Sequence, residues 1–308
     1  MADHRHSHNH NHDSQSVLLS ALVLTALFAG VEVLAGWWAN SLALIGDAGH
    51  MITDSLSLGI GALAAWMSRK PPSTKHSYGL ARAETVGALI NILFMLALIG
   101  FLAVEAIDRL THPAPVKGEA VMVVAGLGLA INLAVAWMLH RGEQNLNVRG
   151  AMLHVMGDLL GSVAALVAGG VIFWTGWNPI DPILSILIAA LILASSLRLL
   201  RDILHVIMEG VPFDIELDAV GQAMADCQGV THVHDLHVWA LDSGTYAISA
   251  HVVVDCMEAW DTYRAALECL LADSFGIKHT TLQPESGQNF DRACADGACG
   301  KDYTPGSY

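Results

Sequence analysis

The sequence predicts a membrane protein with six transmembrane α-helices and a C-terminal cytoplasmic α+β domain, ferredoxin-like with the order α-β-β-α-β. Only 14% of the 308 residues are charged and 54% are hydrophobic, whereas soluble proteins average about 25% charged residues. Six apolar segments each approach the roughly 20 residues that a helix needs to cross a bilayer. After residue 208 the pattern changes to that of a small soluble domain. We therefore expect four parts: a disordered tail over 1–16, a membrane domain over 17–208, a cytoplasmic domain over 209–286 and a flexible tail over 287–308.

The first part is rich in histidine and is too polar to build a core, so we expect it to be disordered. Its imidazoles could gather metal ions loosely, or the segment could be a solvated tail without a specific site. The histidines concerned are His4, His6, His8, His10 and His12.

The six apolar segments have the flanking residues of membrane spans. They run at about 17–38, 42–66, 83–107, 120–139, 148–174 and 182–207. Most tryptophans fall near segment ends, as membrane–water interfaces favour. Lysine and arginine concentrate between segments two and three, between segments four and five, and at the end of segment six. Because cytoplasmic loops carry the excess of these residues, we expect both termini in the cytoplasm.

Two of these segments carry a histidine followed four residues later by an aspartate. His50 and Asp54 lie in the second segment, and His154 and Asp158 lie in the fifth. Positions i and i+4 share one face of a helix, so two facing helices would offer two imidazoles and two carboxylates to one point. Such a tetrahedral set suits Zn²⁺ or a similar divalent ion. Ionisable groups near the bilayer middle are costly and indicate function, so we expect a metal site here.

Two further acids in the membrane segments allow more than one interpretation. Asp47 precedes Asp54 by seven residues, which places it on the same helix face about 10 Å away along the axis. It could line an exit path, but we favour an interfacial acid at the start of a helix. Glu32 lies in the middle of its segment and could support the metal site or belong to a water path.

The last third of the chain predicts a small two-layer domain. Helices are expected at 216–226 and 259–275, and strands at 231–241, 245–254 and 279–285. This order fits a sheet with both helices on one face.

A second metal site could lie on the other face of that sheet. If the first two strands close with a two-residue loop at 243–244, Leu236 faces His251 and His234 is a diagonal neighbour of His251. His234, His251 and Glu285 could then bind a metal, or they could be ordinary polar residues of a solvated face. His237 should point to the opposite face from His234.

The negative charge is concentrated in the same part of the chain. From residue 209 onward there are 16 acidic and 4 basic side chains, which account for most of the net charge of −14. Such a surface argues against nucleic acid as a partner. All five cysteines lie here, and a reduced cytoplasmic setting is the simpler interpretation. Cys294 and Cys299 form a C-x4-C pair that could hold Zn²⁺ with a histidine, although this motif has low specificity.

Several motifs, in this order along the chain, resemble the cation diffusion facilitator family of divalent-metal exporters, especially its bacterial zinc and cobalt–zinc–cadmium resistance branch. They are the His-rich tail, the run from Ser41 to His50, the two His/Asp pairs, and the run from Val233 to Trp239. The resemblance covers nearly the whole chain. It implies a homodimer in a bacterial inner membrane that exchanges cytoplasmic Zn²⁺ for external protons. In that family the two His/Asp pairs are the transport site.

The resemblance also implies roles for cytoplasmic residues. His234, His251 and Glu285 match positions that bind a regulatory metal, and Gln283 stands where some members have a ligand histidine. The ions implied are transported and regulatory Zn²⁺, with no organic cofactor. Elsewhere, a charged pair falls where some relatives have an interlock at the cytoplasmic face; its members are Arg82 and Glu209.

The four intramembrane ligands suggest how metal and protons would compete. Metal binding needs neutral imidazoles and ionised carboxylates, so binding releases protons, and alternating access would make the exchange vectorial. An intramembrane metalloprotease is the main rival, but such enzymes usually need an H-E-x-x-H motif and an open water position, and the chain lacks that motif. A membrane metal sensor would not explain carboxylates near the bilayer middle. We therefore expect a secondary transporter of Zn²⁺, with Cd²⁺, Co²⁺ and Ni²⁺ as further candidates, and not an enzyme.

Overall fold

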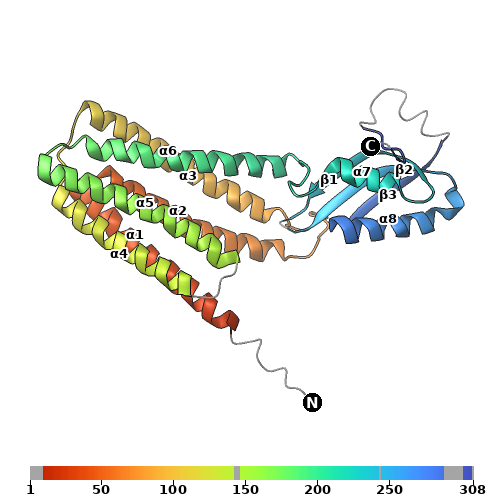
Figure 1. Cartoon of the computed structure of the whole chain (residues 1–308), viewed down its shortest axis with the longest axis horizontal. Coiled ribbons are helices and arrows are strands. Elements are labelled where there is room, and N and C mark those ends of the chain that lie inside the picture. Colours follow the sequence, from red (N-terminus) through yellow and green to blue (C-terminus); the bar gives the residue numbers. More distant parts are fainter. Residues whose placement is uncertain (1–9, 142–145, 243, 288–300, 307–308) are drawn as a thin grey trace, which may run out of the picture. The chain divides into compact units, whose positions relative to one another are not determined.

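A computed structural model divides the chain into two compact units (Figure 1). It describes residues 10–141, 146–242, 244–287 and 301–306. Within these ranges, the side chains of residues 10–22, 141, 146–151 and 153–154 lie outside the description. The first unit comprises the residues up to 60 together with 90–199, and the second comprises 61–89 together with the residues from 200 onward.

Long helices occupy each of the six predicted apolar segments. They are α1 (His10–Ala39), α2 (Leu42–Ser68), α3 (Ala83–Thr111), α4 (Gly118–Arg141), α5 (Leu146–Thr175) and α6 (Ile180–Ile207). In the described part of the chain, four stretches are long and apolar enough to cross a membrane, and a shorter apolar stretch precedes them at Val23–Ala39. The four are Ala83–Thr111, Gly118–His140, Val155–Thr175 and Ile180–Ile207.

The first helix begins earlier than predicted. We expected disorder up to residue 16, but α1 starts at His10, so the prediction was wrong for residues 10–16. Once a helix has nucleated, each further residue adds one backbone hydrogen bond, and an extension into polar sequence therefore costs little.

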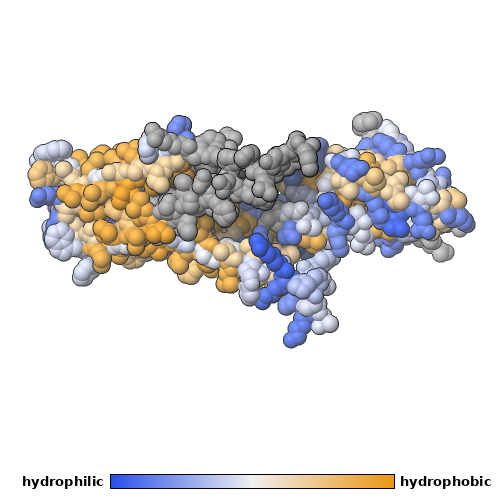
Figure 2. Space-filling view, turned by 90° about the horizontal axis from the view of Figure 1, so that it is seen from below, coloured by the Kyte–Doolittle hydropathy of each residue, from blue (hydrophilic) through white to orange (hydrophobic). Residues whose placement is uncertain are grey.

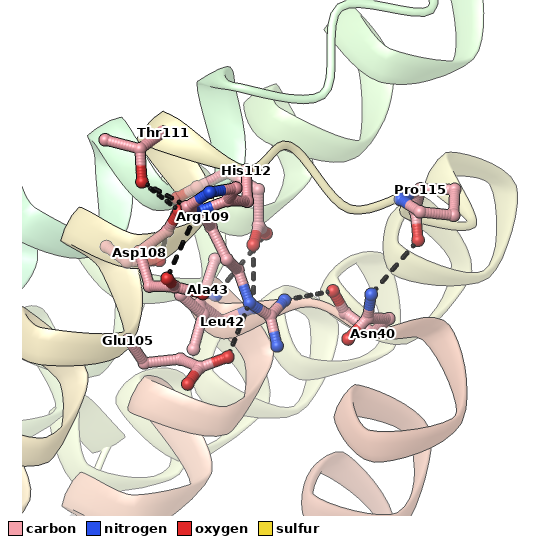
Figure 3. A network of polar contacts seen from close by, with 11 residues as sticks. Asn40, Leu42, Ala43, Glu105, Asp108, Arg109, Thr111, His112 and Pro115 are labelled. Carbon is pink, nitrogen blue, oxygen red and sulfur yellow. Dashed lines mark hydrogen bonds and ion pairs between the residues drawn. The ribbon is translucent and has the colours of Figure 1, made fainter.

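A polar network fixes the turn between α1 and α2 (Figure 3). Arg109 of α3 donates from Nη1 to the carbonyl oxygen of Asn40 at 2.6 Å and from Nε to Glu105 at 2.9 Å. Asn40 has a positive φ of 58°, and its side-chain amide donates to the carbonyl oxygen of Pro115 at 3.2 Å. Three segments are thereby joined at one end of the helices.

The first turn of α2 is capped by an acid from α6. The carboxylate of Asp181 accepts from the hydroxyl of Ser41 at 2.5 Å and from the backbone N–H of Leu42 at 2.7 Å. A helix N-terminus otherwise has unsatisfied N–H groups and a partial positive charge. Asp181 therefore fixes where α2 begins, and so where the side chains farther along α2 lie.

Two glycines allow α4 and α5 to pack at backbone contact. An ideal Cβ at Gly118 would lie 2.8 Å from the carbonyl oxygen of Gly169, and one at Gly169 would lie 2.8 Å from the backbone nitrogen of Met122. Small residues at such positions are typical of helix pairs in membranes.

Large apolar side chains cover the outside of the long helices (Figure 2). Leu27, Leu34, Val104 and Leu160 are 66–71% exposed. An extended apolar surface of this kind is unfavourable in water and is normal in contact with lipid.

The C-terminal domain has the predicted order of elements. They are α7 (Leu217–Ala225), β1 (Val230–Ala240), β2 (Tyr246–Val254), the 3-10 turn η1 (Met257–Ala259), α8 (Trp260–Phe275) and β3 (His279–Ser286). β2 is the central strand, antiparallel to β1 and parallel to β3. Met224 of α7 and Leu271 of α8 share one core with Ile248 and Val252 of β2, so both helices cover the same face of the sheet.

Residues 301–306 fold back onto this domain, although we predicted a flexible tail from residue 287. Tyr303 exchanges two backbone hydrogen bonds of 3.0 and 2.9 Å with Val233 of β1, and it is only 4% exposed. Its ring lies where a Cβ on Gly221 would be 2.5 Å away, and its hydroxyl donates to Asp218 at 2.8 Å. The prediction was wrong for these residues because an aromatic ring completes the core; residues 288–300 lie outside the described part.

Candidate metal sites

His50, Asp54 and Asp158 come together in the first unit. His50 Nε2 lies 3.4 Å from Asp54 Oδ2, one turn farther along α2, and 4.0 Å from Asp158 Oδ1 of α5. Asp158 is 2% exposed, whereas His50 and Asp54 are 21% and 25% exposed. Two carboxylates, one from each helix, thus lie within 4.0 Å of the His50 imidazole, and imidazole and carboxylate are donor types that Zn²⁺ accepts.

His154 is the fourth expected ligand, and its side chain lies outside the described residues. Its backbone lies in α5, four residues before Asp158. The two helices are antiparallel where they meet, because Asp47 lies against Gly161 while His50 lies near Asp158. Continuing this register by one turn brings position 154 level with position 54. The backbone is therefore compatible with a four-ligand set.

Two buried acids lie close to this group. Asp47 is 3% exposed and packs against Gly161 of α5, and its position relative to the membrane surface stays a prediction. Glu32 of α1 is fully buried against Gly128 of α4. Within the described residues, neither oxygen of Glu32 nor Oδ2 of Asp47 has a hydrogen-bond partner. Buried carboxylates without partners are costly, which indicates a functional interior rather than a packing role.

His234, His251 and Glu285 form a second group in the C-terminal domain, one from each strand. His234 Nε2 lies 3.2 Å from Glu285 Oε2, and His251 Nδ1 lies 2.8 Å from Glu285 Oε1. Each residue offers a ligand atom within 4.8 Å of the other two. His234 and Glu285 are 1% and 8% exposed, so these two are not ordinary residues of a solvated face.

One nitrogen of this group is oriented as a metal ligand would be. His251 Nδ1 is buried and makes no hydrogen bond within the described part, although it is close to Glu285. The imidazole nitrogen and the carboxylate oxygen thus lie 2.8 Å apart without a hydrogen bond between them. An imidazole nitrogen and a carboxylate oxygen arranged this way suit a cation such as Zn²⁺.

The strand register differs from the prediction. His234 lies directly opposite His251, and His237 lies opposite Ser249, so two residues of β1 face the single residue Ala250. This β-bulge places His237 on the same face as His234, contrary to the prediction. The sequence carries a signal of the bulge: the buried apolar positions 233, 236 and 238 are spaced by three and then by two, which interrupts strand alternation.

The expected charge pair is in contact within the second unit. Arg82 Nη2 lies 3.1 Å from Glu209 Oε1, and the side chains are 37% and 65% exposed. A pair exposed to this degree typically contributes about 0–1 kcal/mol to stability. Its role as an interlock stays a prediction.

The structure describes no side chain of the metal-ligand candidates in the two tails. At the N-terminus they are His4, His6, His8, His10 and His12. At the C-terminus they are Cys294 and Cys299. Their metal-binding roles stay predictions.

The fold and the two clusters define a multi-pass membrane protein with two candidate cation sites. One cluster, of His and Asp, lies among the long apolar helices, and the other, of His and Glu, lies in a small α+β domain. The chain matches the family model of the cation efflux transmembrane domain over residues 18–208 and that of the cation efflux protein cytoplasmic domain over residues 212–287. It belongs to the cation efflux family, whose members are transporters and not enzymes.

Two relatives match over most of their length. Zinc transporter ZitB of Escherichia coli K12 is 41% identical over 271 residues, which cover 87% of this chain and 86% of that protein. A cadmium, cobalt and zinc/H(+)-K(+) antiporter of Bacillus subtilis is 35% identical over 287 residues, 91% and 92% of the two chains. A solved structure of the metal-bound C-terminal domain of the CzcD transporter from Cuprividus metallidurans is 38% identical and covers 23% of this chain and 99% of that chain, with a TM-score of 0.22.

Proposed function

We propose that this protein is a secondary active transporter that exports Zn²⁺ from the cytoplasm in exchange for protons, with Cd²⁺, Co²⁺ and Ni²⁺ as further candidate substrates. The observation that carries the proposal is the convergence of His50 with Asp54 and Asp158 from two helices. His154, on the same helix as Asp158, would complete the tetrahedral set. The family of the chain and the names of its relatives support zinc as the substrate.

The exchange follows from competition for the same lone pairs. Zn²⁺ binds neutral imidazole and ionised carboxylate, so each binding event releases protons from these groups. When the site faces the cytoplasm, Zn²⁺ displaces protons; when it faces outward, protons displace Zn²⁺. Export therefore needs helices that expose His50 and its partners alternately to the two sides.

The membrane arrangement we propose has six spans, formed by α1 to α6, in the bacterial inner membrane with both termini in the cytoplasm. It is supported by the excess of lysine and arginine in the connections 67–82 and 140–149. We propose four parts: a His-rich tail (1–16) that joins α1 from His10 onward, the membrane domain (17–208), the cytoplasmic domain (209–286), and a C-terminal tail (287–308) of which residues 301–306 pack on the cytoplasmic domain. The protein would be a homodimer, with the Arg82–Glu209 pair as an interlock at the cytoplasmic face.

The second cluster would hold a regulatory Zn²⁺. His234, His251 and Glu285 supply two imidazoles and one carboxylate, and a fourth tetrahedral position stays open for water or another ligand. An acidic cytoplasmic domain with such a site would respond to the concentration of the ion that the membrane domain exports.

Transport by purified protein in liposomes tests the proposed function. Asp54→Ala should abolish Zn²⁺ flux and the coupled proton flux, because the site loses a charged ligand, while the protein stays folded. Asp108→Ala, at an exposed end of α3, is the control and should transport normally. Native flux in the Asp54 variant would refute the assignment. Binding without flux in the unmodified protein would favour a sensor, and peptide cleavage would favour a protease.

A further inference from the structure

Asp235 of β1 has an unusual backbone conformation next to the cytoplasmic cluster. It lies in the β-bulge between His234 and His237 and has a positive φ of 49°. This left-handed region is normally occupied by glycine, and it is uncommon for other residues. Non-glycine residues persist there where surrounding contacts hold them, and they cluster at functional sites. The conformation therefore prompts the question of what the Asp235 carboxylate does.

The two oxygens of Asp235 face two imidazoles. Oδ2 lies 3.6 Å from His251 Nε2, and Oδ1 lies 3.0 Å from His237 Nε2. In regular strand alternation, a residue that follows His234 would point to the helix-covered face. The bulge turns the Asp235 carboxylate to the face that carries the metal cluster, and this accounts for the left-handed backbone.

The ring of His251 is thus held between two carboxylates that have different tasks. Its Nδ1 faces Glu285 and the proposed metal position, while its Nε2 faces Asp235. A neutral imidazole has one N–H and one lone pair. When a metal binds the Nδ1 lone pair, the single proton of the neutral ring must lie on Nε2, and the Asp235 carboxylate stabilises that tautomer. Metal-binding histidines commonly donate their second N–H to a carboxylate in this way.

We propose that Asp235 is a positioning residue of the cytoplasmic metal site: its carboxylate, 3.6 Å from His251 Nε2, moves closer to accept the Nε2–H when Zn²⁺ binds and so directs Nδ1 to the ion. This inference rests on the proposed regulatory site. A second ion held by Asp235, His237 and His251 is disfavoured, because an imidazole that already binds one ion would have to lose its remaining proton to bind another. His237 instead fixes the orientation of Asp235 through the 3.0 Å contact.

The test measures Zn²⁺ affinity of the full-length protein in detergent by competition with a zinc chelator. Every protein in this comparison carries Asp54→Ala and Asp158→Ala, which remove zinc binding at the membrane site. The zinc binding that is lost when His251→Ala is added is then assigned to the cytoplasmic site. Asp235→Asn, which keeps the shape but removes the charge, should weaken this binding by about 10–100-fold. Asp261→Asn removes the same charge at a position 94% exposed on α8 and should leave it unchanged.

A second comparison separates positioning from general support of the fold. Because Asp235 acts through His251, Asp235→Asn should cause no further loss of zinc affinity in the His251→Ala background. The thermal midpoint of the metal-free protein should be the same with Asp235→Asn as without it. Unchanged affinity in Asp235→Asn, equal losses in both backgrounds, or a lower metal-free midpoint would each overturn the positioning role. If His251→Ala removes no binding component, the regulatory site itself is wrong.

Discussion

Tyr303 and Gly221 are in contact, so the effect of Gly221→Ala on stability should change sign when the tyrosine ring is removed. In the native chain, Gly221→Ala would place a Cβ 2.5 Å from the buried tyrosine ring. Overpacking of this kind costs about 1–3 kcal/mol and should outweigh the gain of about 1 kcal/mol of alanine over glycine in a helix. Tyr303→Ala should itself destabilise the C-terminal domain by about 3 kcal/mol, since truncation of a buried aromatic side chain costs about 3–5 kcal/mol and this ring packs at the edge of the core.

The double variant should reverse the effect at position 221. Once the ring is gone, alanine no longer meets it, and Gly221→Ala should stabilise α7 by about 1 kcal/mol. Hydrogen exchange of the full-length protein, followed by mass spectrometry, measures the opening free energy of α7 and β1 in all four proteins. If Gly221→Ala acts with the same sign in both backgrounds, the packing argument is wrong. If Tyr303→Ala leaves exchange in α7 and β1 unchanged, residues 301–306 do not belong to the folded domain.

Three further predictions concern the two units and the N-terminal tail. Gly161→Ala places a Cβ 2.5 Å from the Asp47 carboxylate of α2, so it should lower the thermal midpoint and the zinc flux. Gly157→Ala on the same helix is the control: no described atom lies within 4 Å of its Cβ, and both quantities should stay unchanged. Equal effects of the two substitutions would contradict the close approach of α2 and α5. A hydrogen bond from Lys301 lowers the pKa of Asp218, so the folded domain binds this proton less readily than the unfolded chain. The resulting stabilisation should be complete above the ordinary aspartate pKa and lost as pH falls through the lowered pKa. The urea midpoint of the native protein should therefore fall more steeply with acid than that of Lys301→Ala. The same pH dependence in both proteins would argue against this contribution. Deletion of residues 1–13 should reduce only the rate or apparent affinity of zinc transport in liposomes, and complete loss would give the tail an essential role.

The pattern of apolar residues predicted the helices and strands of this protein, because each helix or strand depends on residues that are close together in the sequence. Continuous apolar runs of membrane length produced α1 to α6, and the change to alternating patterns placed three strands and two helices after residue 208. The spacing of four between His50 and Asp54 puts both on one face of α2 whatever that helix packs against.

Contacts between elements required the tertiary structure. Burial of Asp47 depends on α5 having a glycine at position 161, and the core position of Tyr303 depends on a glycine at position 221. A polar residue such as Asp47, or a residue close to the C-terminus such as Tyr303, is buried when a glycine on the neighbouring helix leaves space for its side chain.

The β-bulge in β1 illustrates the physical reason most clearly. Side chains alternate along a strand with a period of two, so one inserted residue moves all later side chains to the other face. Local patterns predicted a strand over 231–241, and β1 lies at Val230–Ala240. Its pairing with β2 decided that His234 lies opposite His251 and that His237 shares their face. Secondary structure arises from short-range periodicity, whereas the assembly of a site depends on registers between segments that are far apart in the chain.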